Sequence, residues 1–249
     1  ISKRKGNYVN PDELLKEYGA DAIRYWATGA SLGANHKFTL EEVEKGKYLA
    51  NKLWNASRYC SMNLEDYKPN NKVDLEPEDK WMLDQLNRTI KKVTESFEGY
   101  EYAKARKALD DLFWSTFCDY YLEVVKHRSD EEAVKYTLYT CLLNIVKLYA
   151  PILPFITEEI YQNLFKENFN KVSIHKSKWP EFKKEWELEE KELQGIKHFI
   201  EEIDNVRKER AEKGLKYREE LESYKIQTEI DKDIFGEKLK KILKIKDLK

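Results

Sequence analysis

Apolar residues recur every three or four positions along most of this chain, which predicts amphipathic helices rather than strands. A long helix is predicted to begin at Thr39, where Glu42 completes a capping box, and to continue to about Met62. Its apolar stripe consists of Leu49, Leu53, Ala56 and Cys60. The other side of the helix is polar, so the pattern predicts that only one side is buried.

Capping signals divide the rest of the chain into further helices. Pro77 and Pro154 each fit the first position of a helix, and Ser129 with Glu132 forms a capping box for a helix that ends at Pro151. The predicted helices cover residues 10–18, 20–30, 39–62, 77–97, 101–127, 129–150, 154–165 and 186–214.

The last part of the chain has a different pattern. Residues 223–230 alternate between apolar and polar, which predicts a strand, and residues 231–245 predict a helix. The predicted fold class is therefore mainly α: a bundle of about five long helices with a short helical connector before it and a small C-terminal α/β appendage. The expected division is 1–38 for the connector, 39–215 for the bundle and 216–249 for the appendage.

Composition supports helices and excludes some kinds of protein. Charged residues make up 37% of the chain, and it has only 9 Gly and 6 Pro, which favours solvated helices. The net charge of -1 excludes a surface that is basic throughout. The three cysteines form no C-x-x-C pair, so we expect reduced core thiols and no metal site. No apolar run is long enough for a membrane span, and we expect a cytoplasmic protein.

The first residues form a cationic, glycine-containing loop ahead of a helix. Lys3, Arg4 and Lys5 precede Gly6, and mobile ammonium groups of this kind can stabilise a phosphate whose charge grows in a transition state. From composition alone, an ordinary solvated basic terminus is the preferred interpretation.

The polar side of the helix from Thr39 carries aromatic and cationic residues. Tyr48, Lys52, Asn55 and Tyr59 share one face, and Lys45 and Arg58 lie beside it. Proteins that read single-stranded RNA stack bases on aromatic rings and bind phosphates with cations, so this face is a candidate RNA-binding surface. Partial packing of the tyrosines is the alternative.

Two other groups of residues have simpler interpretations. Aromatic residues recur at helical spacing and are expected in the core: Trp81, Phe113, Trp114, Phe117, Tyr120 and Tyr121. The cations at the end of the 186–214 helix suit the negative end of its dipole, with contact to RNA phosphates as the alternative: Arg207, Lys208, Arg210, Lys213 and Lys216.

Several segments resemble class I aminoacyl-tRNA synthetases. "ISKRKGN" is similar to their signature loop K-M-S-K-S-x-G-N, with Ile1, Ser2 and Lys3 on M-S-K and Arg4 in place of the last Ser. "YGADAIRYW" fits the subgroup for branched aliphatic amino acids and methionine. "NKLWNASRY", "FCDYYLEVVKHR", "APILPFITEEIYQ" and "SIHKSKWP" most resemble valyl-tRNA synthetases of archaeal type, over about residues 1–212. Isoleucyl, leucyl and methionyl enzymes share the loop and the bundle and are the nearest alternatives.

The resemblance implies a role for the opening loop in ATP-dependent activation of valine. Lys3 would be catalytic and would contact the ATP phosphates with Ser2 and Lys5, with Mg present. The chain contains no H-x-G-H pattern, because its four histidines are isolated. We therefore expect that it binds no ATP alone, and that activation needs the catalytic domain of the same polypeptide.

The resemblance also implies a partner for the aromatic face. In valyl enzymes this helix presents a Lys and an aromatic residue to the central and third anticodon bases, and Lys52 and Tyr59 occupy those places. The expected function is binding of the anticodon stem-loop of tRNA(Val) by a monomer. A non-catalytic helical domain for protein interaction is the alternative from another class.

Overall fold

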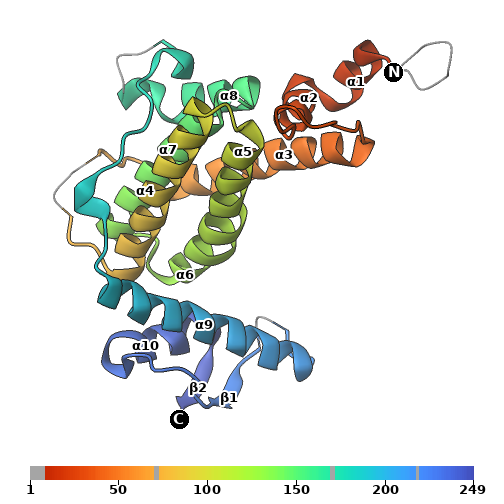
Figure 1. Cartoon of the computed structure of the whole chain (residues 1–249). Helices are drawn as coiled ribbons and strands as arrows, with labels where there is room; N and C mark the ends of the chain where they lie inside the picture. The colour runs from red at the N-terminus through yellow and green to blue at the C-terminus, as the bar shows by residue number, and fades with distance from the viewer. Residues whose placement is uncertain (1–8, 70–72, 169–171, 217–218) are drawn as a thin grey trace.

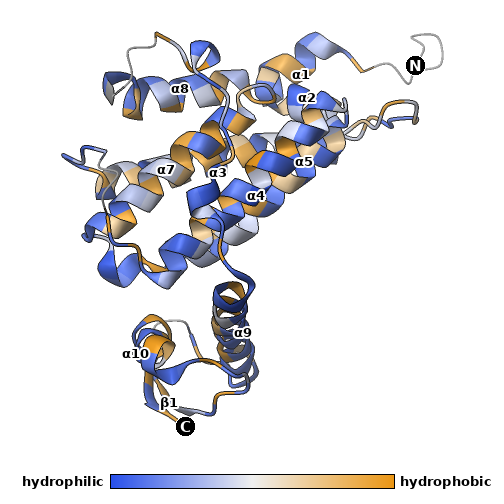
Figure 2. Cartoon of the chain, turned by 60° about the vertical axis from the view of Figure 1, so that its left-hand side comes forward, coloured by the Kyte–Doolittle hydropathy of each residue, from blue (hydrophilic) through white to orange (hydrophobic). Residues whose placement is uncertain are grey.

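A computed structural model describes residues 9–69, 73–168, 172–216 and 219–249. These residues form an α-helical bundle with a short helical connector at one end and a smaller α/β unit at the other (Figure 1). The helices carry both hydrophobic and hydrophilic residues, as amphipathic packing requires (Figure 2). The predicted fold class, mainly α with a small α/β appendage, is confirmed.

Two short helices make up the connector. In α1 (Pro11–Tyr18) the Asn10 side chain accepts a hydrogen bond from the backbone of Asp12, which confirms the predicted cap. Gly19 has a φ of 82°, a conformation that favours glycine, and it separates α1 from α2 (Ala20–Ala27).

The bundle follows the predicted order of helices. Its elements are α3 (Leu40–Asn63), α4 (Pro77–Glu98), α5 (Tyr102–Asp111), a π-helical segment (Leu112–Tyr121), α6 (Leu122–Val124), α7 (Glu132–Tyr149) and α8 (Pro154–Leu164). Short 3-10 turns lie at Lys126–Arg128, Lys166–Asn168, Ile174–Lys176 and Lys184–Trp186. The predicted stripe of α3 is buried, and all three cysteines are buried and free.

The π-helical segment is the main feature of the bundle that the sequence pattern did not predict. Its wider turn aligns residues four apart, and Phe113, Phe117 and Tyr121 form a stacked aromatic column in the core. The core prediction is confirmed for these residues. Trp114 and Tyr120 are only half-buried, because they lie on the edge of the same segment.

Several predicted helix boundaries are wrong. The capping residue of α7 is Glu131, not Ser129, because residues 126–128 form a 3-10 turn first. Thr39 does precede α3, but its side chain makes no capping bond, and Glu42 pairs with Lys45 instead. The helix predicted from residue 186 begins at residue 190.

The connector is fixed to the bundle by polar contacts at both sides of the α7–α8 turn. Asp21 accepts hydrogen bonds from the backbone N–H groups of Phe155 and Ile156, at 3.1 and 2.8 Å, in the first turn of α8. Arg24 donates to the carbonyls of Pro151 and Ile152, at 2.7 and 3.2 Å. One pair of side chains on α2 therefore binds both sides of that turn.

A glycine permits close packing of α2 on α3. A Cβ atom on Gly46 would lie 2.9 Å from the Cα and carbonyl oxygen of Ala22 and 2.9 Å from the Cβ of Tyr25. Behind this contact, the Tyr25 hydroxyl donates to Asp110, which also accepts a hydrogen bond from Tyr149.

Gly46→Ala should lower the free energy of unfolding by about 1–3 kcal/mol, because the added methyl group meets backbone atoms that cannot move aside. Gly195→Ala is the matched control. Gly195 also lies in a helix, and its added methyl would meet only Phe235 at 4.0 Å, so this change should raise stability by roughly 0.5–1 kcal/mol. Urea unfolding of both variants measures the difference, and equal effects would show that the close contact is not limiting.

The C-terminal unit contains α9 (Glu190–Glu212), β1 (Leu221–Tyr224), α10 (Lys232–Leu243) and β2 (Ile245–Leu248). The strands pair in parallel, with Leu221 opposite Ile245. The predicted strand at 223–230 is only partly correct, because β1 ends at Tyr224 and the chain then turns.

Two buried charged side chains hold the C-terminal unit together. Arg210 donates to carbonyls of Lys216, Glu219 and Leu243, and Glu202 accepts hydrogen bonds from Tyr224, Gln227 and Thr228.

A buried ionic cluster lies where the two units meet. Arg128 is 5% exposed and binds Asp79 at 2.8 Å and Glu78 at 3.1 Å, both from the first turn of α4. Lys238 of α10 binds the other Glu78 oxygen at 2.7 Å. Tyr121 donates a hydrogen bond to Asp79 at 2.7 Å. The cluster therefore joins α4, the 3-10 turn at 126–128 and α10.

Candidate nucleic-acid interface

The outward side of α3 has the residues that the sequence pattern placed there. Tyr48 is 68% exposed, and Asn55 and Arg58 are also exposed. Lys52 and Tyr59 lie on the edge of the same side and are half-buried. We call these residues, together with Lys45, the α3 face. The structure thus brings the six predicted residues onto one helix surface.

Lys52 lies against the π-helical segment rather than in open solvent. Its ammonium nitrogen is 5.4 Å from the centre of the Trp114 ring, a cation–π distance. Trp114 is half-buried, so its ring supports the lysine from one side. This contact limits the positions that Lys52 can take and leaves the ammonium group on the surface.

Tyr59 is neither free nor sealed inside the core. One part of its ring packs against the hydrophobic core, while the side chain stays partly accessible. Burial raises the pKa of the Tyr59 hydroxyl, because it disfavours the phenolate, so the group stays protonated and can donate a hydrogen bond. A ring supported on one side and accessible on the other suits base stacking.

Lys45 is less available than its exposure indicates. Its ammonium group lies 3.0 Å from Glu41 and 2.7 Å from Glu42, and these partners raise its pKa. A phosphate would have to compete with both carboxylates. Met62, 76% exposed at the end of the same helix, extends the α3 face, and the sequence pattern did not single it out as a surface residue.

The other candidate residues fall into two groups. Ser2, Lys3 and Lys5 lie outside the described residues. Arg210 is buried by its carbonyl contacts, so the phosphate-binding alternative is wrong for this residue. Arg207 donates to the carbonyl of Asp119 and lies over the Tyr120 ring at 5.2 Å, which links α9 to the π-helical segment.

The described residues contain neither a metal site nor a membrane-spanning helix. No group of three or more His, Cys, Asp or Glu side chains there could hold a metal ion. No described helix is both long and apolar enough to cross a membrane.

The arrangement of the helices is that of a known synthetase structure. Agrobacterium radiobacter K84 agnB2 LeuRS, solved as a ternary complex with tRNA and LeuAMS, matches 76% of this chain and 23% of its own, with a TM-score of 0.62. At 22% sequence identity this likeness establishes the fold alone. This chain therefore has the fold of the matching part of that synthetase structure.

The sequence defines the family more closely. The profile of the anticodon-binding domain of tRNA ligases matches residues 79–226, which is more than half of the chain. The chain therefore belongs to that family.

Its curated relatives include valine--tRNA ligases from both bacteria and archaea. The enzyme of Haloarcula marismortui is 43% identical over 72% of this chain, that of Ehrlichia canis 40% over 86%, and that of Pyrococcus furiosus 36% over 95%. The chain spans only 20–28% of the length of these relatives. Because the relatives include both bacterial and archaeal enzymes, the resemblance to the archaeal type of enzyme stays a prediction.

Proposed function

We propose that this chain binds the anticodon stem-loop of tRNA(Val) and serves a valine--tRNA ligase. The relatives at 36–43% identity support the choice of valine, and the family match supports the anticodon. The α3 face lies before the matched range, so its role rests on its geometry: a half-buried tyrosine and lysine beside an exposed tyrosine on one rigid helix.

The proposed mechanism uses each type of residue for a different contact. Tyr59 stacks with an unpaired base, and the Lys52 ammonium, held over Trp114, binds a base edge or a phosphate. Tyr48 and Asn55 extend the surface along the helix, and Arg58 adds a cation at its other edge. Because the phosphate contacts release counterions, affinity should fall as salt rises.

The choice of amino acid can be tested by comparing two transcripts. The chain should bind tRNA(Val) more tightly than tRNA(Ile), because each wrong base typically costs about 1–3 kcal/mol in hydrogen bonds and stacking. Filter binding at two salt concentrations measures both affinity and its salt dependence. A preference for tRNA(Ile) would assign the chain to an isoleucyl enzyme instead.

The role of the opening loop is a separate proposal. Lys3, supported by Ser2 and Lys5, stabilises the ATP phosphates while pyrophosphate leaves, and Mg accompanies the ATP. In a valine--tRNA ligase that includes this chain, Lys3→Ala should slow pyrophosphate exchange about 100-fold or more and leave tRNA affinity nearly unchanged. A normal rate of pyrophosphate exchange would exclude Lys3 from catalysis.

Gel filtration tests the further proposal that the chain is a monomer.

A further inference from the structure

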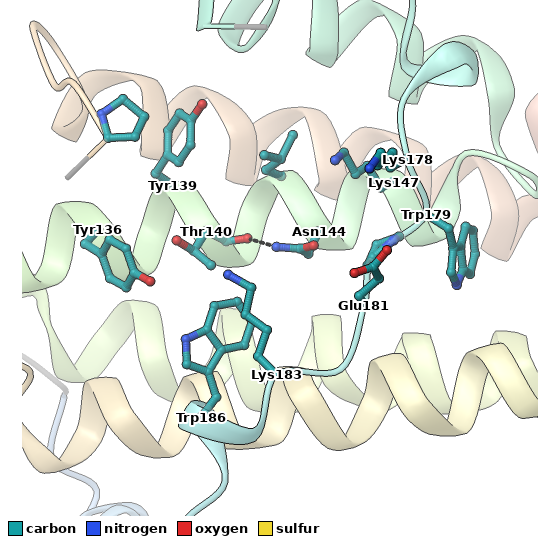
Figure 3. Close-up of a pocket in the computed structure, with 13 residues that line it drawn as sticks. Tyr136, Tyr139, Thr140, Asn144, Lys147, Lys178, Trp179, Glu181, Lys183 and Trp186 are labelled. Carbon is teal, nitrogen blue, oxygen red and sulfur yellow. Dashed lines mark hydrogen bonds between the residues drawn. The ribbon is translucent and has the colours of Figure 1, made fainter. Parts of the chain in front are cut away.

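A second basic and aromatic site lies away from the α3 face. It is a cavity of about 460 Å³ between one side of α7 and the segment 178–186 (Figure 3). We call it the α7 pocket. None of the six residues of the α3 face lines it.

The outer wall of the α7 pocket is held in place by polar side chains of α4. Asn87 makes two hydrogen bonds with the backbone of Lys183, one to its carbonyl and one from its N–H, both at 2.8 Å. At the other end, the Trp179 indole donates to Thr94 at 2.8 Å. These contacts fix an otherwise irregular segment, so the pocket is largely preformed and its ligand meets little ordering cost.

The lining carries more positive than negative charge. Lys147, Lys178 and Lys183 contribute cations, and Glu181 contributes one carboxylate. Neither Lys178 nor Lys183 forms an ion pair with any described residue. Lys147 is half-buried, and burial lowers the pKa of its ammonium group, so an anion nearby would favour its charged form.

Aromatic rings border the cations. Lys183 lies over the ring of Trp186, which is buried, at 4.3 Å, and Tyr136 of α7 is half-buried on the facing wall. Figure 3 shows Tyr136, Trp186 and Lys183 grouped at one end of the pocket, with Lys147 and Lys178 at the other. Thr140 and Asn144 lie between them and supply polar groups. An inorganic anion would use the lysines but not the rings.

We propose that the α7 pocket binds a nucleotide, with its base against Tyr136 and its phosphate in contact with the lysines that line the pocket. The size of the cavity lies within the range of small-molecule sites, and rings beside cations are the two elements that nucleotide binding needs. The nucleotide comes either from a single-stranded RNA or from the free pool. This site is additional to the proposed anticodon contact.

The test uses the whole chain with two probes, AMP and a single-stranded RNA hexamer. Binding should shift the indole N–H signals of Trp179 and Trp186 in nitrogen-15 NMR spectra. Lys178→Ala with Lys183→Ala should weaken binding about tenfold, since two cationic contacts are lost. Tyr136→Leu should weaken it about tenfold by removing a stacking surface.

The control removes two lysines that do not line the pocket, one inside the 178–186 segment and one just before it. Lys176→Ala with Lys184→Ala changes the net charge equally, and both residues are exposed, so affinity should stay within about twofold. AMP binding identifies a free nucleotide as the ligand, and binding of the hexamer alone identifies an RNA strand. Either result supports the site.

Three results would overturn the proposal: no indole shift with either probe, equal losses in the pocket and control variants, or tighter binding of an oligoglutamate peptide than of both probes. The outcome is independent of the α3 face. A chain with Lys52→Ala and Tyr59→Ala should still bind the probes at the α7 pocket, even if it has lost tRNA(Val).

Discussion

Lys52→Ala combined with Tyr59→Ala should weaken binding of tRNA(Val) by about 2–4 kcal/mol, since a stacked base contributes about 1–3 kcal/mol and the lysine contact adds to it. This is about 30- to 1000-fold in the dissociation constant. Both side chains lie on one edge of α3, and both are supported by the protein, Lys52 by Trp114 and Tyr59 by the core. Both side chains are therefore held in position before the RNA binds.

The half-buried ring of Tyr59 requires a variant that separates stacking from packing. Tyr59→Leu keeps apolar contact with the core and removes the aromatic face, so it should lose RNA affinity with little loss of helicity. Lys92→Ala with Tyr100→Ala removes the same residue types from exposed positions elsewhere. If this control weakened tRNA binding as much as the first pair, the α3 face would not be the specific RNA-binding surface.

If the unchanged chain had no salt-dependent affinity for tRNA, the alternative function, a protein-interaction domain, would be favoured.

Arg128→Ala should lower the free energy of unfolding by about 3–5 kcal/mol, the largest stability effect that we expect. The change leaves Asp79 buried without its cation and leaves Glu78 with Lys238 alone, and the cost of an uncompensated buried charge is much larger than the net value of the ion pair. Chemical denaturation followed by circular dichroism measures the loss. Lys126→Ala, which removes a pair with Glu123 at the surface, should cost less than about 1 kcal/mol.

The pH dependence of the Arg128→Ala variant checks the cause. Burial already raises the pKa of Asp79 in the folded chain, and removal of Arg128 should raise it further. A carboxyl whose pKa is higher in the folded than in the unfolded state binds its proton more tightly when folded. The variant should therefore recover stability relative to the unchanged chain as pH falls from about 7 to about 5. A loss that does not depend on pH would indicate a packing defect instead.

The sequence predicted those features of the fold that depend on local pattern. The apolar stripe of α3, the cap at Asn10 and the helix starts at Pro77 and Pro154 are each encoded within a few residues. The α3 face was predicted for the same reason, because residues spaced by seven on a helix share one side.

Features that depend on distant contacts were not predictable in this way. Asp84 and Asn87 read as surface residues of α4, yet both are buried because they bind the backbone of the 183–188 segment. Arg128 reads as part of a basic run and is buried for the same kind of reason. The parallel pairing of β1 with β2 requires α10 to connect them, and no local signal specifies it. The α7 pocket was missed because its wall comes from an irregular segment.

The grip of Asp21 and Arg24 on the α7–α8 turn has a mechanical consequence. The connector cannot rotate relative to the bundle without breaking four hydrogen bonds at once. Thermal fluctuations should therefore displace the connector and the bundle together, as a single rigid body. A force applied to α1 is therefore transmitted through α2 to the α7–α8 turn.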